Sequence, residues 1–307
     1  MHKIISAQIV ILAFVFSALA QNVVPAEPQL KFPVWSAPAP RMKASTPFSP
    51  KPTKGSNIFD GEKEQWLADA VIKIGGGYLV AIDDKEVSDY ISALGANLAL
   101  YSAAPGRHYQ FTVVNDEEEN AFSIGAGRIY IDLGMLKAVE SEDELVGVLG
   151  HEIGHDAFGH GPKTITRQLF WMTGVTRVKT AGEVEKDVHD LLAAYKKNSF
   201  AEIGENLLGW SRNDELQADK AGFYNIYKAG YNPEAMKSVF RRYVAKEKKS
   251  SDYESEYFLT LLFGSHPPSS QRVTALKWES NWIKMSPKDE RYKNTAFDAM
   301  KARVAMM

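Results

Sequence analysis

The sequence predicts a helix-rich α+β domain with a small sheet. Most apolar side chains recur at the three- and four-residue spacing of helices, and only two short segments alternate like strands. The chain has 307 residues, of which 45% are hydrophobic, enough for one sizeable domain with its own core. It contains no cysteine, so disulfides, thiolate nucleophiles and cysteine-bound metals are excluded. The net charge of −2 argues against a nucleic-acid partner.

The first 20 residues have the layout of a secretory signal peptide. Lys3 provides a cationic start, residues 4–19 are mostly apolar, and Ala18-Leu19-Ala20 is a cleavage motif. We therefore expect cleavage after Ala20 and a periplasmic or secreted protein. An uncleaved membrane anchor is the alternative, although the apolar run is slightly short for a span of about 20 residues.

A proline-rich linker is expected over residues 21–52. Eight of the fourteen prolines lie between Pro25 and Pro52, and proline lacks the N–H group that helices and sheets need. The predicted organisation is therefore a signal peptide over 1–20, this linker, and one globular domain over 53–307.

The elements of the globular domain follow in order from the spacing of apolar side chains. The predicted helices cover 62–74, 87–100, 142–158, 214–229 and 233–245, the stretch 163–210 is also expected to be helical, and the predicted strands cover 109–114 and 127–131. Within the long helical stretch, the bulky cluster Leu169-Phe170-Trp171-Met172 is expected to pack in the core.

The helix over 142–158 has clear boundaries and carries a chemical motif. Ser141 and Glu144 match a capping box, and Gly159 ends the helix. Inside it, His151-Glu152-Ile153-Gly154-His155 is an H-E-x-x-H sequence. Residues four apart lie on one helix face, so both imidazoles can bind a single cation. Neutral imidazoles suit Zn²⁺, and Glu152 can act as general base toward a water at that cation.

Two other kinds of site that share these letters are excluded. A ferritin-like di-iron centre needs a second Glu-x-x-His, and the chain has only the one from Glu152 to His155. A metzincin continues H-E-x-x-H-x-x-G-x-x-H, whereas this chain has Phe158 in place of the glycine and His160 one position early. We therefore interpret His160 as a loop or core histidine rather than a ligand.

Glu215 is the best candidate for the third metal ligand. Glu215-Leu-Gln-Ala-Asp219 opens another predicted helix, so its two acids share a face. The carboxylate of Asp219 can accept an N–H group from a ligating histidine and so fix its tautomer. The site is then expected to bind one Zn²⁺ per chain through His151, His155 and Glu215.

A second candidate lies in the segment from His266 to Arg272. Pro267 and Pro268 stiffen the backbone after His266, so a rigid loop can aim a donor at the oxyanion of a tetrahedral intermediate. Arg272 lies in the first turns of the following helix. Two alternatives stay open: an ordinary surface turn, or a resting enzyme in which His266 occupies the open position of the metal.

These motifs, in their order along the sequence, resemble those of the zinc metallopeptidase family of HtpX and the CAAX prenyl protease. That family has soluble periplasmic members such as BepA. The resemblance covers about residues 60–280 and includes 120–122 and 127–131. It implies a gluzincin fold with zinc on His151, His155 and Glu215, Glu152 as base, Asp219 behind the ligands, and His266 and Arg272 near the scissile carbonyl.

The resemblance also implies how a substrate binds. In this family an extended substrate adds to the edge strand that borders the active site. Here the matching strand carries Gly127, Arg128, Ile129 and Tyr130, which are therefore the expected substrate-binding residues.

The predicted function is a zinc endopeptidase that cleaves extended or misfolded polypeptides in the cell envelope. The alternative is a non-catalytic, zinc-stabilised binding or chaperone-like protein for the same clients, which is disfavoured because every residue needed for turnover is present. Polypeptides are the expected partners and nucleic acids are not. Peripheral proximity to a membrane stays open, and the sequence indicates no oligomeric state.

Overall fold

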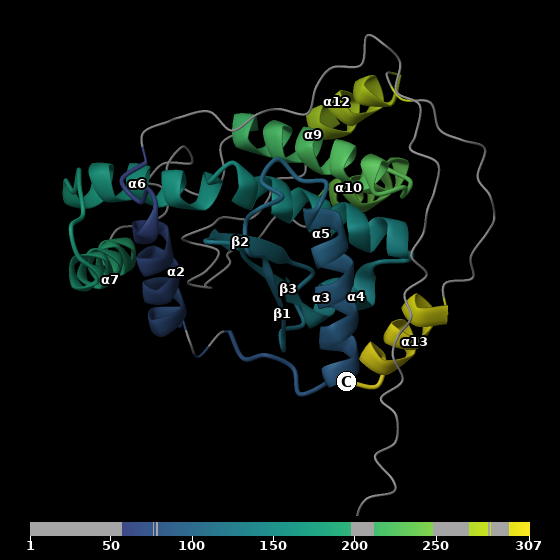
Figure 1. Ribbon diagram of the computed structural model, residues 1–307, viewed down its shortest axis with the longest axis horizontal. Helices are drawn as coiled ribbons and strands as arrows, with labels where there is room; N and C mark the ends of the chain where they lie inside the picture. The colour runs from purple at the N-terminus through teal and green to yellow at the C-terminus, as the bar shows by residue number, and fades with distance from the viewer. Residues whose placement is uncertain are drawn as a thin grey trace, which may run out of the picture. The chain divides into compact units, whose positions relative to one another are not determined.

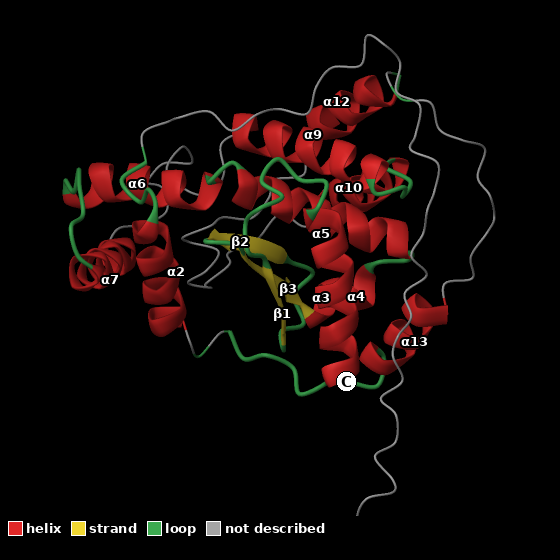
Figure 2. Cartoon of the chain, in the orientation of Figure 1, coloured by secondary structure: helices red, strands yellow, loops and turns green. Residues whose placement is uncertain are grey.

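The computed structural model describes residues 57–75, 77, 79–197, 212–247, 270–281, 283 and 295–307. The predicted signal peptide, the predicted linker and His266 lie outside the described residues. Helices make up most of the described chain and surround a small sheet, as Figure 2 shows. The predicted α+β class is therefore confirmed.

Three strands form one mixed sheet in the order β1–β3–β2. They are β1 (Gln110–Val114), β2 (Ala121–Gly125) and β3 (Arg128–Asp132). β3 runs parallel to β1, with Ile129 opposite Phe111, and antiparallel to β2, with Tyr130 opposite Phe122. The two edges of the sheet are therefore β1 and β2.

The expectation that 127–131 forms a sheet edge is wrong, because β3 pairs with a neighbour on both sides. The residues of 127–131 are also constrained by their neighbours in the fold. Gly127 has φ +77°, and a Cβ there would lie 1.9 Å from the carbonyl oxygen of His108. Ile129 is fully buried in the core. These two residues are needed by the fold itself.

The other two expected substrate-binding residues are also engaged. Arg128 forms an ion pair with Asp69 at 2.6 Å, and the ring of Tyr130 stacks on that of Phe122 with centroids 5.3 Å apart. Neither is presented at an edge. The edge strand that packs against the helix of the H-E-x-x-H motif is β2.

Helices cover both faces of the sheet (Figure 1). On one side of the sheet lie α3 (Lys85–Ala99), α4 (Leu133–Ala138) and α5 (Glu142–Ala157), with α13 (Thr295–Val304) packed on α3 and α4. On the other side lie α2 (Glu62–Gly75) and α6 (His160–Thr173), with α7 (Ala181–Lys197) packed on both of these helices. Three further helices continue the first layer beyond α5: α9 (Arg212–Lys228), α10 (Glu234–Glu247) and α12 (Ser270–Ser280).

The sheet separates two buried apolar clusters, because successive side chains of a strand point to opposite faces. Ile129 and Ile131 enter the cluster with α3, α5 and α9, while Tyr130 enters the cluster with α2, α6 and α7. All five residues of β2 are buried. A strand covered on both faces shows no alternation of polar and apolar residues, which explains why the sequence did not predict β2.

The predicted helices are confirmed, with ends that differ by a few residues. The helical expectation for 163–210 is confirmed for α6 and α7 but is wrong for residues 174–180 between them, and residues 198–210 lie outside the described residues. Gly174 adopts φ +75° and ends α6, with its N–H donating to the carbonyl of Phe170, and α7 begins only at Ala181. Core packing of the bulky cluster is confirmed for Leu169. It is wrong for Phe170 and Trp171, which are 50% and 67% exposed.

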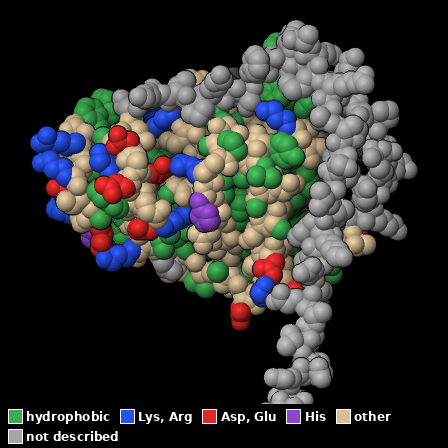
Figure 3. All heavy atoms as spheres, in the orientation of Figure 1, with side chains coloured by type: hydrophobic (Ala, Val, Ile, Leu, Met, Phe, Trp, Pro, Cys, Tyr) green, Lys and Arg blue, Asp and Glu red, His purple; other side chains and the backbone are tan. Residues whose placement is uncertain are grey.

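The surface is unevenly charged. On the face shown in Figure 3, side chains of both signs gather over α2, α6 and α7. Lys73 of α2 pairs there with Glu185 of α7 at 2.6 Å. Among the helices that the structure describes, none is both long enough and apolar enough to cross a membrane.

Candidate active site

Helix α5 presents the H-E-x-x-H motif in a buried position. At its start, the hydroxyl of Ser141 accepts the N–H of Glu144 at 3.2 Å. The Glu144 carboxylate reaches back to the N–H of Glu140 at 2.8 Å, one residue before the position that the capping box predicts. The helix is therefore fixed at the end that precedes the motif. All three polar residues of the motif are buried: His151, Glu152 and His155.

Helix α9 lies directly against α5 because glycines remove the side chains where the two helices cross. A Cβ on Gly222 would lie 2.9 Å from the carbonyl carbon of Gly150 and 2.9 Å from the backbone nitrogen of His151. A Cβ on Gly154 would lie 2.9 Å from the carbonyl oxygen of Ala218. This close crossing lets the first turns of α9 reach the imidazoles of α5.

Glu215 of α9 meets the two imidazoles. The Nε2 atom of His155 lies 3.2 Å from Oε1 of Glu215, and Nε2 of His151 lies 3.6 Å from Oε2. The two Nε2 atoms are 3.0 Å apart. One candidate ligand atom from each residue lies within 4.8 Å of the other two. Two imidazole nitrogens and one carboxylate oxygen form a donor set that catalytic zinc sites use.

Asp219 and Arg272 lie behind these three side chains. The Nδ1 atom of His151 is 2.9 Å from Oδ1 of Asp219. Arg272 of α12 donates through Nε and Nη2 to Asp219 at 2.7 and 2.5 Å, and its Nη1 lies 2.6 Å from Oε2 of Glu215. Its guanidinium carbon sits 4.1 Å from the ring centroid of Phe240. A single arginine thus contacts both carboxylates.

Burial and local charge favour the protonation states that a metal needs. Burial, together with Arg272, lowers the pKa of His151, and burial together with His151 places the pKa of His155 well below its ordinary value. Burial alone would raise the pKa of Asp219, but Arg272 outweighs it and lowers that pKa. Neutral imidazoles and an ionised carboxylate behind them suit a divalent cation.

His160 is buried at the start of α6, in agreement with its interpretation as a loop or core histidine. Its Nδ1 atom lies 2.9 Å from Nδ1 of His155, and its Nε2 atom lies 3.0 Å from Oε1 of Gln217. This contact does not follow from the sequence pattern. Residues five apart do not share a helix face, and the meeting depends on Gly159, whose φ of +62° turns the chain between α5 and α6.

Asp156, next to His155, connects α5 to the turn between β2 and β3. Its Oδ2 atom accepts the N–H of Gly127 at 2.9 Å and the hydroxyl of Ser123 at 3.1 Å, while Oδ1 lies 2.6 Å from Nε of Arg107. Burial raises the pKa of Asp156 to about 6, against the opposing effect of Arg107. In the sequence, the only signal for Asp156 is its position directly after the motif.

Comparison with known proteins agrees with this geometry. The model of "Peptidase family M48" matches residues 85–280, which include every candidate site residue named above. The chain is 24% identical over 208 residues to the "Beta-barrel assembly-enhancing protease" of Yersinia pestis, an alignment covering 67% of this chain and 41% of that protein.

Two other relatives carry different names. The chain is 28% identical over 178 residues to the "Mitochondrial metalloendopeptidase OMA1" of Arabidopsis thaliana, covering 58% of this chain and 33% of that one. It is 24% identical over 199 residues to the "Metalloprotease YcaL" of Escherichia coli K12, covering 62% and 72%. The chain spans less than half the length of the beta-barrel assembly-enhancing proteases of Yersinia pestis and Escherichia coli K12 that it matches.

Proposed function

The chain belongs to peptidase family M48, and on that premise we propose that it is a zinc-dependent endopeptidase that cleaves extended polypeptides. The membership confirms the family resemblance and makes the chain a metallopeptidase. One observation carries the finer proposal: the convergence of His151, His155 and Glu215 in a buried cluster between α5 and α9.

The cluster fits zinc by its donors. It offers two imidazole nitrogens with lowered pKa values and one carboxylate oxygen, and it contains no cysteine that would favour softer metals. Bound there, Zn²⁺ would polarise the scissile carbonyl and lower the pKa of a water to about 7.

The surrounding residues supply proton transfer and orientation. We assign Glu152, which follows His151 on α5 and is buried, as the base that takes a proton from the attacking water and passes it to the leaving amine. Asp219 accepts the Nδ1–H of His151 and holds its ring, while Arg272 holds the carboxylates of Asp219 and Glu215. His266 is the proposed donor to the oxyanion.

An extended polypeptide is the proposed substrate. Since β3 pairs on both sides, strand addition at the edge beside α5 would use β2 instead. Misfolded or unassembled envelope proteins are proposed as clients, by analogy with relatives named for β-barrel assembly. A periplasmic or secreted location, with cleavage after Ala20, belongs to the same proposal.

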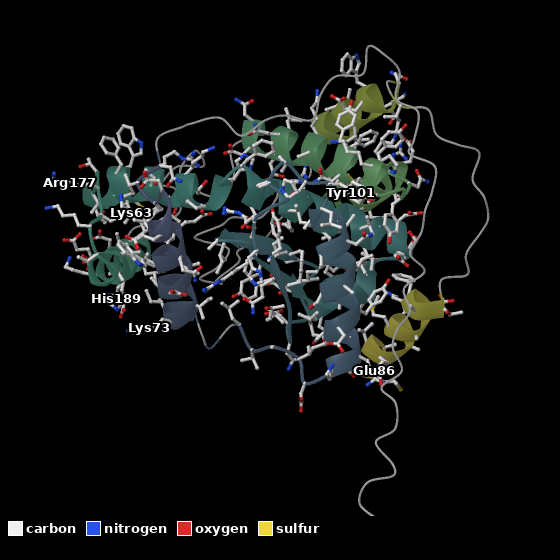
Figure 4. All side chains as sticks on the ribbon, viewed as in Figure 1. Lys63, Lys73, Glu86, Tyr101, Arg177 and His189 are labelled. Carbon is white, nitrogen blue, oxygen red and sulfur yellow. The ribbon has the colours of Figure 1, made fainter. Side chains whose placement is uncertain are left out.

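The test measures metal content and casein cleavage by the purified protein, with and without a chelator. We expect bound zinc and chelator-sensitive cleavage. Glu152→Gln should keep zinc and lose cleavage by about 10²-fold or more, because the general base is removed while the ligands remain. Glu86→Gln is the matched control, since Glu86 lies exposed on α3 (Figure 4). Cleavage of casein by Glu152→Gln at the wild-type rate would contradict the assignment of Glu152 as the base.

The wild-type and Glu152→Gln proteins also test the binding-protein alternative, in an assay that follows the aggregation and degradation of a client. That alternative requires zinc without cleavage, and equal protection of an aggregating client by the wild-type and Glu152→Gln proteins. We expect instead that the wild-type protein degrades the client, and that protection without degradation is seen only with Glu152→Gln.

A further inference from the structure

Two histidines of the proposed metal site have different partners on the side away from Glu215. The Nδ1 atom of His151 faces the carboxylate of Asp219 at 2.9 Å. The Nδ1 atom of His155 instead faces Nδ1 of His160, also at 2.9 Å. A metal-binding histidine usually donates its second N–H to a carboxylate, a carbonyl oxygen or water, so an imidazole in this place needs an explanation.

The pair of imidazoles permits one arrangement of hydrogens when His155 binds metal through Nε2. The hydrogen of His155 is then on Nδ1, so Nδ1 of His160 must be the acceptor and the hydrogen of His160 must be on Nε2. That atom lies 3.0 Å from Oε1 of Gln217, an oxygen that can accept it. The carboxylate of Asp214, at 3.6 Å from the same Nε2, favours the same arrangement.

We propose that His160 is a positioning residue for the metal: it holds His155 in the tautomer that presents a lone pair at Nε2, and Gln217 sets the tautomer of His160. Two successive side-chain contacts, His155 to His160 and His160 to Gln217, join α5 and α6 to α9, the helix that also carries Glu215. The inference rests on the proposed zinc site and adds two residues to it.

The first measurement is zinc affinity, by competition with a chromophoric chelator. His160→Phe keeps a ring of similar size but removes the acceptor, and we expect zinc binding to weaken by about 10–100-fold. Gln217→Met, which leaves His160 in place, should weaken it less. The matched control is His189→Phe, because His189 lies on α7 away from the site (Figure 4) and should keep wild-type affinity.

A second measurement separates positioning from general packing. Long-range ¹H–¹⁵N spectra of the zinc-loaded protein should show His155 protonated at Nδ1 and His160 at Nε2. Gln217→Glu supplies a stronger acceptor and should tighten zinc binding, the opposite sign to Gln217→Met, whereas a packing role predicts losses in both. Gln217→Met also covers the case in which His160→Phe does not fold.

Each result has a distinct meaning. If the wild-type protein binds no zinc, the proposed function fails together with this inference. This inference alone is overturned if the wild-type protein binds zinc and the zinc affinity of His160→Phe lies within about twofold of the wild-type affinity. It is also overturned if the spectra show His160 protonated at Nδ1.

Discussion

Asp219 in the candidate active site and Asp132 at the end of β3 are both almost fully buried, at 1% and 5% exposure, yet their pKa values move in opposite directions. Burial raises the pKa of Asp132 to about 8, and the neighbouring acids Asp116 and Glu118 add to the rise. Burial acts the same way on Asp219, but the guanidinium of Arg272 reverses the result. Burial alone therefore does not decide whether a carboxylate is charged.

The difference shows how the candidate active site keeps negative charge in a buried position. Arg272 is itself buried, and the carboxylates of Asp219 and Glu215 raise its pKa although burial opposes that change. One cation thus contacts two anions and offsets part of their charge. At the end of β3, burial and two neighbouring acids all raise the pKa of Asp132, and no cation among the described residues offsets them there. With a pKa of about 8, the carboxyl group of Asp132 is expected to hold a proton at neutral pH.

The largest effect is expected for Arg272→Met. Removing the cation leaves Asp219 and Glu215 as buried charges without their main partner, which should cost about 3–5 kcal/mol of unfolding free energy in metal-free protein. Denaturant unfolding measures this loss. Added zinc should restore part of it, because a ligand that binds only the folded state stabilises that state. A loss below about 1 kcal/mol would contradict the role given to Arg272.

Asp132→Asn tests the other half of the comparison. The folded pKa of about 8 lies above the ordinary value of 3.8, so between these values the folded protein holds a proton that the unfolded chain has released. Wild-type stability should therefore fall as pH rises from 4 to 8, by at most about 1.4 kcal/mol per pH unit from this group. The asparagine cannot ionise, so its advantage should grow on the order of 2 kcal/mol from pH 5 to 7.

The control for this pH dependence is Asp298→Asn, which changes an exposed carboxylate on α13. Unfolding curves at several pH values should show a constant difference between this variant and the wild-type protein. If Asp132→Asn also differs from wild type by a constant amount over pH 5–8, then Asp132 is charged and the contrast with Asp219 does not hold.

Two glycine variants distinguish the α5–α9 crossing from the region around Asp132 by their effects on zinc affinity. Gly222→Ala places a methyl group 2.9 Å from the backbone of Gly150 and His151, so α9 must move away from α5. We expect a loss on the order of 1–2 kcal/mol and weaker zinc binding. Gly134→Ala would meet the carbonyl oxygen of Glu117 at 2.1 Å, near Asp132, and should destabilise the fold while leaving zinc affinity unchanged. Equal zinc affinity in both variants would contradict the link between the α5–α9 crossing and the site.

The residues of the candidate metal site could be selected from the sequence because their placement within each helix follows from local periodicity. The helical period places His151 and His155 on one face, and it places Glu215 and Asp219 together on another helix. The absence of cysteine and of a suitably spaced third histidine left Glu215 as the candidate ligand. The structure then brings these four side chains together.

The parts that the sequence did not predict depend on contacts between distant segments. The central place of β3 depends on its pairing with β2, a strand whose buried residues show no alternation. The contact between His160 and His155 depends on the left-handed turn at Gly159. The raised pKa of Asp132 depends on which acids the folded chain gathers around it.

The smallest effect is expected for Arg303→Met, which removes another two-point contact between an arginine and an aspartate. Arg303 donates to Asp84 through Nη2 at 2.7 Å and Nε at 3.0 Å, but its side chain is 38% exposed. The substitution leaves only the Asp84 carboxylate, which is 10% exposed beside Arg303 and gains access to water when that side chain is shortened, so the loss in stability should be small and should shrink further in high salt. A loss equal to that of Arg272→Met would mean that the contact itself, rather than its burial, stabilises the charged aspartate. The comparison of Asp219 with Asp132 would then need another cause.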